Sequence, residues 1–158
     1  MSPSGSKTWH TSVRPNSLLK PLLTTNMFIT FAYAAWDGGP DLAFSSAGHV
    51  PLLHYRASIG GIEQRAVSNL PLGILLTQDF SSSSLPFERG DMLAIVSDGF
   101  TGTFDSKGRD FGVTGIEEIL QNARGKELRE ISTELRASVC EYGEQRDDQT
   151  TLLVRRVA

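Results

Sequence analysis

The chain has 158 residues, of which 39% are hydrophobic and 21% are charged. This length is enough for one domain with a hydrophobic core and is short for two. The formal net charge is −3, and acidic and basic residues are interspersed, so the chain lacks the basic surface of a nucleic-acid-binding protein and we expect no nucleic-acid partner.

The N-terminal part predicts a tail followed by one domain. Residues 1–14 are expected to be a loose polar tail, because they lack the apolar stretch of a secretory signal. Residues 15–158 are expected to form a single domain. Its longest apolar run, 27–36, is about half as long as a membrane-spanning helix, so we interpret it as a core strand and expect no membrane association. The lone Cys140 cannot form an internal disulfide, which favours a reducing compartment, the cytoplasm.

The first two thirds of the chain are mostly β-prone. Residues 15–17 predict the cap of a short helical piece at 18–23, which Pro21 limits. Strands are then expected at 27–36, 42–44, 51–56, 62–67 and 87–96, separated by glycine-rich and serine-rich turns.

The last third predicts two helices and a strand. Thr114 can cap a helix over 115–121. A second helix over 126–142 carries one apolar face, made of Leu128, Ile131, Leu135, Val139 and Tyr142. Cys140 is interpreted as a small core residue beside that face, and the apolar run 150–157 as an interior strand. Together these elements predict a layered α+β domain.

Two acidic turns lie at the ends of apolar strands. The first, at 97–99, contains Asp98, and the second, at 146–150, contains Asp147 and Asp148. Carboxylates held rigidly at strand ends are suited to hard divalent cations such as Mg²⁺. Three alternatives stay open: 98–99 can be a plain turn in which Gly99 supplies a positive φ, and 147–148 can be a solvated helix-to-strand connector or form a plain ion pair with Arg146.

Six short motifs, in order and spacing, resemble the C-terminal part of SpoIIE-like phosphatases. These belong to the metal-dependent (PPM, protein phosphatase 2C-like) protein phosphatases. The motifs are Ser46-Ala47-Gly48-His49-Val50-Pro51-Leu52-Leu53, Leu70-Pro71-Leu72-Gly73, Arg89-Gly90-Asp91, Ser97-Asp98-Gly99, Phe111-Gly112 and Asp147-Asp148-Gln149-Thr150. Each is weak alone, but six in register are a strong signal.

The resemblance implies a fold, a chemistry and a partner. The fold is an α-β-β-α sandwich, apparently lacking its N-terminal strands. The chemistry is hydrolysis of phosphoserine or phosphothreonine by a water that two Mn²⁺ or Mg²⁺ ions activate. By position Asp98 and Asp147 match metal ligands, whereas Gly99 and Asp148 are weaker candidates, either as ligands or as their neighbours. The partner implied is a phosphorylated regulatory protein of the anti-sigma-factor-antagonist type.

The sequence also departs from the family pattern. The family's Gly-Asp motif and its Asp-x-x-Gly-His-Gly motif, which supplies the aspartate that bridges both ions, do not occur before Phe28, and Gly102 stands where an accessory acid is usual. Asp105 is offset from that position. We therefore expect weak catalysis from a C-terminal portion of the domain, either a fragment or a truncated reading frame.

The sequence leaves two rival functions open. The first rival is a non-catalytic binding module that keeps the fold; the second is a structural remnant that self-associates through unpaired sheet edges into a homo-oligomer.

His49 is interpreted as a structural hydrogen-bonding residue rather than a general acid, and His54 as a strand residue with one solvent-facing side.

Overall fold

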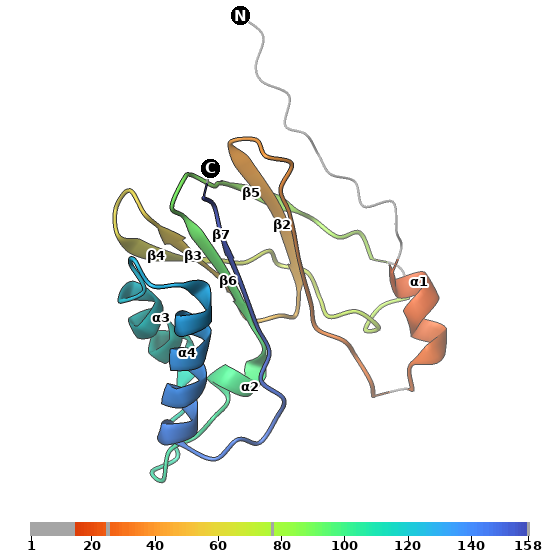
Figure 1. Cartoon of the computed structure of the whole chain (residues 1–158). Helices are drawn as coiled ribbons and strands as arrows, with labels where there is room; N and C mark the ends of the chain where they lie inside the picture. Colours follow the sequence, from red (N-terminus) through yellow and green to blue (C-terminus); the bar gives the residue numbers. More distant parts are fainter. Residues whose placement is uncertain (1–14, 25, 77, 158) are drawn as a thin grey trace, which may run out of the picture. The chain divides into compact units, whose positions relative to one another are not determined.

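The computed structural model describes residues 15–24, 26–76 and 78–157 (Figure 1). The predicted tail at 1–14 lies outside them. In chain order the elements are α1 (Pro15–Leu19), the 3-10 helix η1 (Lys20–Leu22), β1 (Phe31–Ala35), β2 (Asp41–Ala47), β3 (Leu52–Arg56), β4 (Gly61–Arg65), β5 (Ser83–Pro86), β6 (Met92–Val96), α2 (Asp98–Thr101), α3 (Gly112–Gln121), α4 (Leu128–Tyr142) and β7 (Thr151–Arg155).

The chain divides into two compact units, which are described separately. The first comprises the described residues of Met1–His49 together with Val67–Pro86, and contains an antiparallel sheet in the order β1-β2-β5. The second comprises Val50–Ala66 and the described residues of Phe87–Ala158, and contains an antiparallel sheet in the order β4-β3-β6-β7.

In the first unit the interpretation of 27–36 as a core strand was wrong. Only Phe31–Ala35 forms a strand, and β1 pairs with β2 alone at one side of its sheet. Phe31 is 44% exposed and Tyr33 38% exposed, so the face of β1 that carries them is only partly covered by the described residues. The place of a strand in its sheet depends on pairing with distant segments, which an apolar composition does not specify.

Asn16, predicted within a helix cap, instead lies inside α1. Its side chain is buried, and its Oδ1 accepts a hydrogen bond of 2.8 Å from the N–H of Gly73. Lys20 Nζ donates to the carbonyl of the same glycine at 2.6 Å. Gly73, which makes both hydrogen bonds, has φ +88°, a backbone conformation that favours glycine.

In the second unit α3 and α4 cover one face of the sheet (Figure 1). The helix predicted over 126–142 is confirmed as α4, and Glu127 with Glu130 forms its capping box. Thr114 lies inside α3 rather than capping it. The helices and strands bury a continuous apolar cluster: Leu53, Tyr55, Met92, Ala94, Val96, Phe100, Ile116, Leu120, Ala123, Ile131, Leu135 and Val139.

Two further expectations in this unit were wrong. β7 is the last strand of its sheet rather than an interior one, and it alternates: Leu153 packs on the apolar cluster, whereas Leu152 is 53% exposed and Val154 38% exposed. Cys140 is exposed, because it follows Val139 by one position and so points away from the buried face of α4.

His54 has no solvent-facing side, contrary to the prediction. It is fully buried on β3, and its Nε2 lies 3.1 Å from Oδ2 of the equally buried Asp91. Asp91 also accepts the backbone N–H of Ala57 at 2.8 Å and that of Glu88 at 2.9 Å. Desolvation lowers the pKa of His54, and the hydrogen bond and charge of Asp91 offset this only in part. The neutral imidazole therefore donates to Asp91 and joins β3 to the turn before β6.

We predict that this buried histidine makes stability fall in mild acid. His54 resists protonation in the folded state, whereas the unfolded chain binds the proton near the ordinary pKa of 6.5. The contribution of His54 to the free energy of unfolding is complete above that pKa. It declines as the pH falls below it, by at most about 1.4 kcal/mol per pH unit for one proton. Urea unfolding between pH 5.5 and 7.5 should show a steeper decline for the wild type than for His54→Gln, whose amide donates to Asp91 without titrating. Equal slopes would contradict the prediction.

Candidate functional site

The pairing of β6 with β7 brings the two acidic turns together. These strands are antiparallel, with Val96 opposite Thr151. The first acidic turn, 97–99, leaves the end of β6, and the second, 146–150, enters the start of β7. Residues some fifty positions apart in the chain are therefore neighbours in space, all within the second unit.

Ser97 fastens the two turns to each other. Its backbone N–H donates to the carbonyl of Thr150 at 2.9 Å, and the N–H of Thr150 donates to the Ser97 hydroxyl at 2.9 Å. That hydroxyl donates in turn to the carbonyl of Asp148 at 2.9 Å. Gln149 adds a contact from its Nε2 to the carbonyl of Gly99 at 3.3 Å. The backbones that carry the candidate carboxylates are thus held in register.

Gly99 allows the turns to approach each other closely. A Cβ at this position would lie 2.3 Å from the carbonyl oxygen of Asp148 and 3.2 Å from that of Asp147. Gly99 is buried within α2 and is not among the glycines with positive φ, so the alternative of a plain positive-φ turn was wrong. The glycine is needed for space rather than for its backbone angles.

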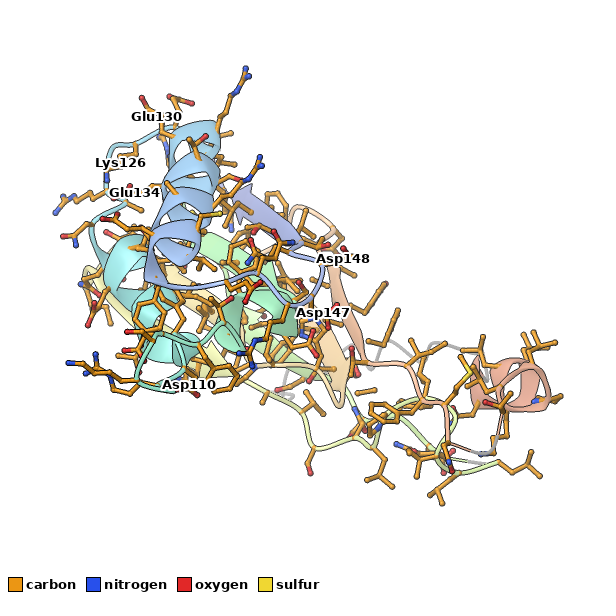
Figure 2. All side chains as sticks on the ribbon, turned by 90° about the horizontal axis from the view of Figure 1, so that it is seen from below. Asp110, Lys126, Glu130, Glu134, Asp147 and Asp148 are labelled. Atoms are coloured by element: carbon orange, nitrogen blue, oxygen red, sulfur yellow. The ribbon has the colours of Figure 1, made fainter. Side chains whose placement is uncertain are left out.

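The three candidate carboxylates are exposed. Asp98 is the first residue of α2, and Figure 2 shows Asp147 and Asp148 on the segment that leads from α4 into β7. Asp147 Oδ1 accepts the N–H of Asp148 at 2.8 Å, which orients that side chain. The carbonyl of Gly99 already accepts the hydroxyl of Thr103 at 3.0 Å, so it is engaged within the protein.

Arg146 does not neutralise the acidic pair. In the described part of the chain no ion pair joins it to Asp147 or Asp148; its guanidinium carbon lies 5.5 Å from the ring centroid of Phe104. The alternative of a plain ion pair with Arg146 is therefore wrong, whereas the alternative of a solvated connector stays open, since Asp147 and Asp148 are both exposed.

Asp105 does not replace the accessory acid that is absent at Gly102. Its Oδ1 accepts the N–H groups of Lys107 and Arg109 at 2.8 and 2.9 Å, and its Oδ2 lies 2.7 Å from the Arg109 guanidinium. The backbone hydrogen bond from Arg109 is the main cause that lowers the pKa of Asp105. Its oxygens organise their own loop.

The donor set fits a single hydrated divalent ion better than a two-ion centre. Hard cations take six or more oxygen ligands, and Mg²⁺ keeps several waters. Asp98 and Asp147 are exposed carboxylates on two neighbouring turns, yet among residues 15–24, 26–76 and 78–157 no three or more His, Cys, Asp or Glu side chains group closely enough to hold a metal. Two terminal carboxylates leave most of the coordination sphere to water.

The remaining motifs have structural contacts. Gly48, with φ +60°, donates its N–H to the carbonyl of Asn69 at 3.1 Å, and a Cβ on it would lie 2.3 Å from Pro71. This brings two of the predicted motifs together in the first unit. Gly48 is followed by His49, which belongs to this unit and not to the unit that carries the acidic turns.

Sequence reasoning missed the residues that fasten the site. Ser97 and Gln149 were quoted only as parts of motifs, although each links one acidic turn to the other. The sequence did offer one signal for them, because each is a polar residue beside an aspartate at the end of a predicted strand. In the first unit, away from the acidic turns, Asn69 was also missed: its Nδ2 donates to the carbonyls of Ser46 at 2.8 Å and Ser81 at 3.0 Å.

Comparisons with known proteins agree with this architecture. The family model described as Stage II sporulation protein E (SpoIIE) matches residues 13–157. Phosphoserine phosphatase RsbU of Bacillus subtilis (strain 168) is 30% identical over 99 residues, which are 58% of this chain and 30% of RsbU. The chain thus spans less than a third of that relative.

Solved structures show the same fold. The phosphatase domain of the cell fate determinant SpoIIE from Bacillus subtilis, presoaked with Mn, matches with a TM-score of 0.66 and 26% identity over 90% of this chain and 63% of that one. A structure of the PP2C phosphatase domain with a fragment of the regulatory domain of the same determinant matches with a TM-score of 0.70 and 23% identity over 89% and 42% of the two chains. The predicted α+β fold of the metal-dependent phosphatase type is confirmed.

We predict that Gly99→Ala forces the acidic turns apart. The new methyl group would overlap the carbonyl of Asp148, and such overpacking costs about 1–3 kcal/mol of the free energy of unfolding. Urea unfolding measures it. Gly61→Ala is the matched control, because a Cβ there meets only the Ile59 side chain at 3.4 Å. If both variants were equally stable, the close approach would not matter.

Proposed function

Because the chain belongs to the SpoIIE family, we propose that it is part of a metal-dependent protein serine/threonine phosphatase that hydrolyses phosphoserine or phosphothreonine on a regulatory protein. The observation that carries the proposal is the junction of the two acidic turns, in which Gly99 lies against the backbone of Asp147 and Asp148. We propose that residues 15–158 form one domain of this family.

In this proposal Asp98 and Asp147 hold a Mn²⁺ or Mg²⁺ ion. A bound divalent ion supplies Lewis-acid charge that lowers the pKa of water and offsets the negative phosphoryl oxygens. Asp148 adds negative charge beside the ion, and its backbone N–H orients the Asp147 carboxylate through the 2.8 Å hydrogen bond. Gly99 contributes by leaving room for the two turns to approach each other, while its carbonyl accepts the hydrogen bond from Thr103. The presoaking of one related structure with Mn favours manganese as the first ion to test.

Catalysis by this chain alone is expected to be weak. The sequence contains no match to the bridging-aspartate motif, and no third acid joins Asp98 and Asp147 among the residues that the structure describes. One loosely held ion provides less charge than two. The alternative function is a non-catalytic phosphatase-like binding module in a signalling circuit, and the exposed carboxylates without a third ligand favour it.

The partner and the location follow from the family. We propose a phosphorylated regulatory protein of the anti-sigma-factor-antagonist type, as part of a partner-switching circuit. In one related protein, from Mycobacterium tuberculosis, RsbU and RsbW domains occur in a single chain, which supports the proposal of a regulatory setting. None of the helices in the described ranges is sufficiently long and apolar to cross a membrane. The exposed lone thiol of Cys140 supports a reducing compartment, and we propose the cytoplasm.

We predict measurable but weak Mn²⁺ binding that depends on both aspartates. Isothermal titration with Mn²⁺ should give a single site with an affinity no tighter than about 10⁻⁴ M, as expected for a largely hydrated ion. Asp98→Ala and Asp147→Ala should each weaken binding at least about tenfold, since each removes a charged ligand. Asp79→Ala, an exposed aspartate of the first unit, is the control. No heat from the wild type, or equal heat from all four proteins, would contradict the metal assignment.

We predict that hydrolysis separates the phosphatase from the binding module. With Mn²⁺ present, a phosphoserine peptide should be hydrolysed slowly, and Asp98→Ala should remove the activity. Phosphate release measures both. Mn²⁺ binding without any hydrolysis would favour the binding module, whereas robust turnover that Asp98→Ala abolishes would overturn the expectation of weak catalysis.

A further inference from the structure

Arg146 is a cation held next to the second acidic turn. It immediately precedes Asp147, and its guanidinium lies 5.5 Å from the centroid of the Phe104 ring, which is 40% exposed. A cation–π contact at an exposed site contributes about 0.5–1 kcal/mol, enough to favour one placement of a flexible side chain. The arginine is therefore oriented by an aromatic ring rather than by a carboxylate.

Phe104 is itself fixed to the site. Its neighbour Thr103 is buried and donates to the carbonyl of Gly99 at 3.0 Å. On the other side the backbone of Phe104 abuts Gly143, where a Cβ would lie 2.0 Å from the Phe104 carbonyl oxygen. The ring that supports Arg146 thus belongs to a segment attached to the first acidic turn and packed against the end of α4.

The hydrogen-bond donors of Arg146 are not used in an ion pair within the described part of the chain. Arg109, on the loop that carries Phe104, differs, because Asp105 lies 2.7 Å from its guanidinium. Arg146 is also exposed, and its guanidinium carbon lies 5.5 Å from the centroid of the Phe104 ring. Guanidinium N–H groups bind two phosphate oxygens at once.

The charges of the site create a need for such a group. Asp98, Asp147 and Asp148 carry three negative charges, and one divalent ion compensates two of them. A phosphate monoester, itself a dianion at neutral pH, would still meet a net negative site. Arg146 adds one positive charge. The charges of the three carboxylates, the divalent ion and the arginine then sum to zero before the phosphate arrives.

We propose that Arg146, supported by Phe104, binds the phosphoryl group of the phosphorylated substrate beside the candidate metal ligands. Arg146 is then a substrate-binding residue and Phe104 a positioning residue. The inference rests on the proposed function, since it takes the substrate to be a phosphoprotein. It adds a residue that selects a phosphorylated side chain over an unmodified one.

Binding rather than turnover tests the inference. The probe is a short phosphoserine peptide, titrated into the protein in saturating Mg²⁺ and followed by amide chemical shifts. Arg146→Ala should weaken binding about tenfold or more, the range expected for loss of a charge-assisted hydrogen-bond pair. Arg146→Lys should recover part of it, because lysine keeps the charge without the planar fork. Phe104→Leu should weaken binding about threefold, in line with one cation–π contact.

The controls distinguish phosphate binding by Arg146 from a general effect of positive charge on the affinity for the peptide. Arg136→Ala removes an exposed arginine from α4 and should leave the affinity unchanged. A peptide with serine in place of phosphoserine should not bind. The Mg²⁺ affinity of each variant is measured separately, so that a change in metal binding is not mistaken for a change in phosphate binding.

The outcomes distinguish the two proposals. Normal Mg²⁺ binding with an unchanged peptide affinity in Arg146→Ala would overturn the inference and leave the proposed function intact. Equal weakening by Arg146→Ala and Arg136→Ala would also overturn it, because only long-range charge would then be involved. If the wild type bound no metal and no peptide, both proposals would fail for this chain.

Discussion

The candidate site depends on the close approach between Gly99 and the backbone of Asp147 and Asp148. The pairing of β6 with β7 places the two turns at the same end of the sheet, but pairing alone tolerates a gap between loops. The Ser97 hydroxyl closes that gap, because it accepts from Thr150 and donates to Asp148. A residue with a side chain at position 99 would separate what these hydrogen bonds join. These backbone contacts therefore position the two acidic turns relative to each other.

The helices add a second constraint from the other side of the turns. The apolar face of α4 is buried against the sheet, and the N–H of Gly143 ends the helix by donating to Val139 at 3.2 Å. Gly143 then passes directly beside the backbone of Phe104. The segment that carries Asp147 thus starts from a fixed point, and the loop that carries Phe104 is held at the same place. Packing in the apolar cluster accordingly decides where Arg146 and its neighbouring carboxylate emerge.

Helices whose apolar residues recur at local spacing were predictable from the sequence. The pairing of strands and of side chains that are distant in the chain was not. The periodic apolar residues of α4 predicted the helix correctly because a helix face is set by residues three and four positions apart. The edge positions of β1 and β7 could not be read from their apolar composition, because the number of neighbours of a strand depends on distant segments. The burial of His54 likewise depends on Asp91, thirty-seven positions away, which satisfies its donor. For the site, the strand-end aspartates were apparent, whereas Ser97 and Gln149 became apparent only once β6 and β7 were paired.

In the proposed site, metal binding and folding stability are linked reciprocally. Exposed carboxylates on adjoining turns repel one another, and the hydrogen bonds of Ser97 and Gln149 maintain their proximity against that repulsion. An ion that binds the folded chain alone stabilises it by an amount that grows with the ratio of free ion to dissociation constant, about 2.7 kcal/mol at a hundredfold excess. A mostly hydrated ion reaches that excess only at high concentration. In the proposed function, chemistry at this site is limited by the number of oxygens that Asp98 and Asp147 supply to the ion.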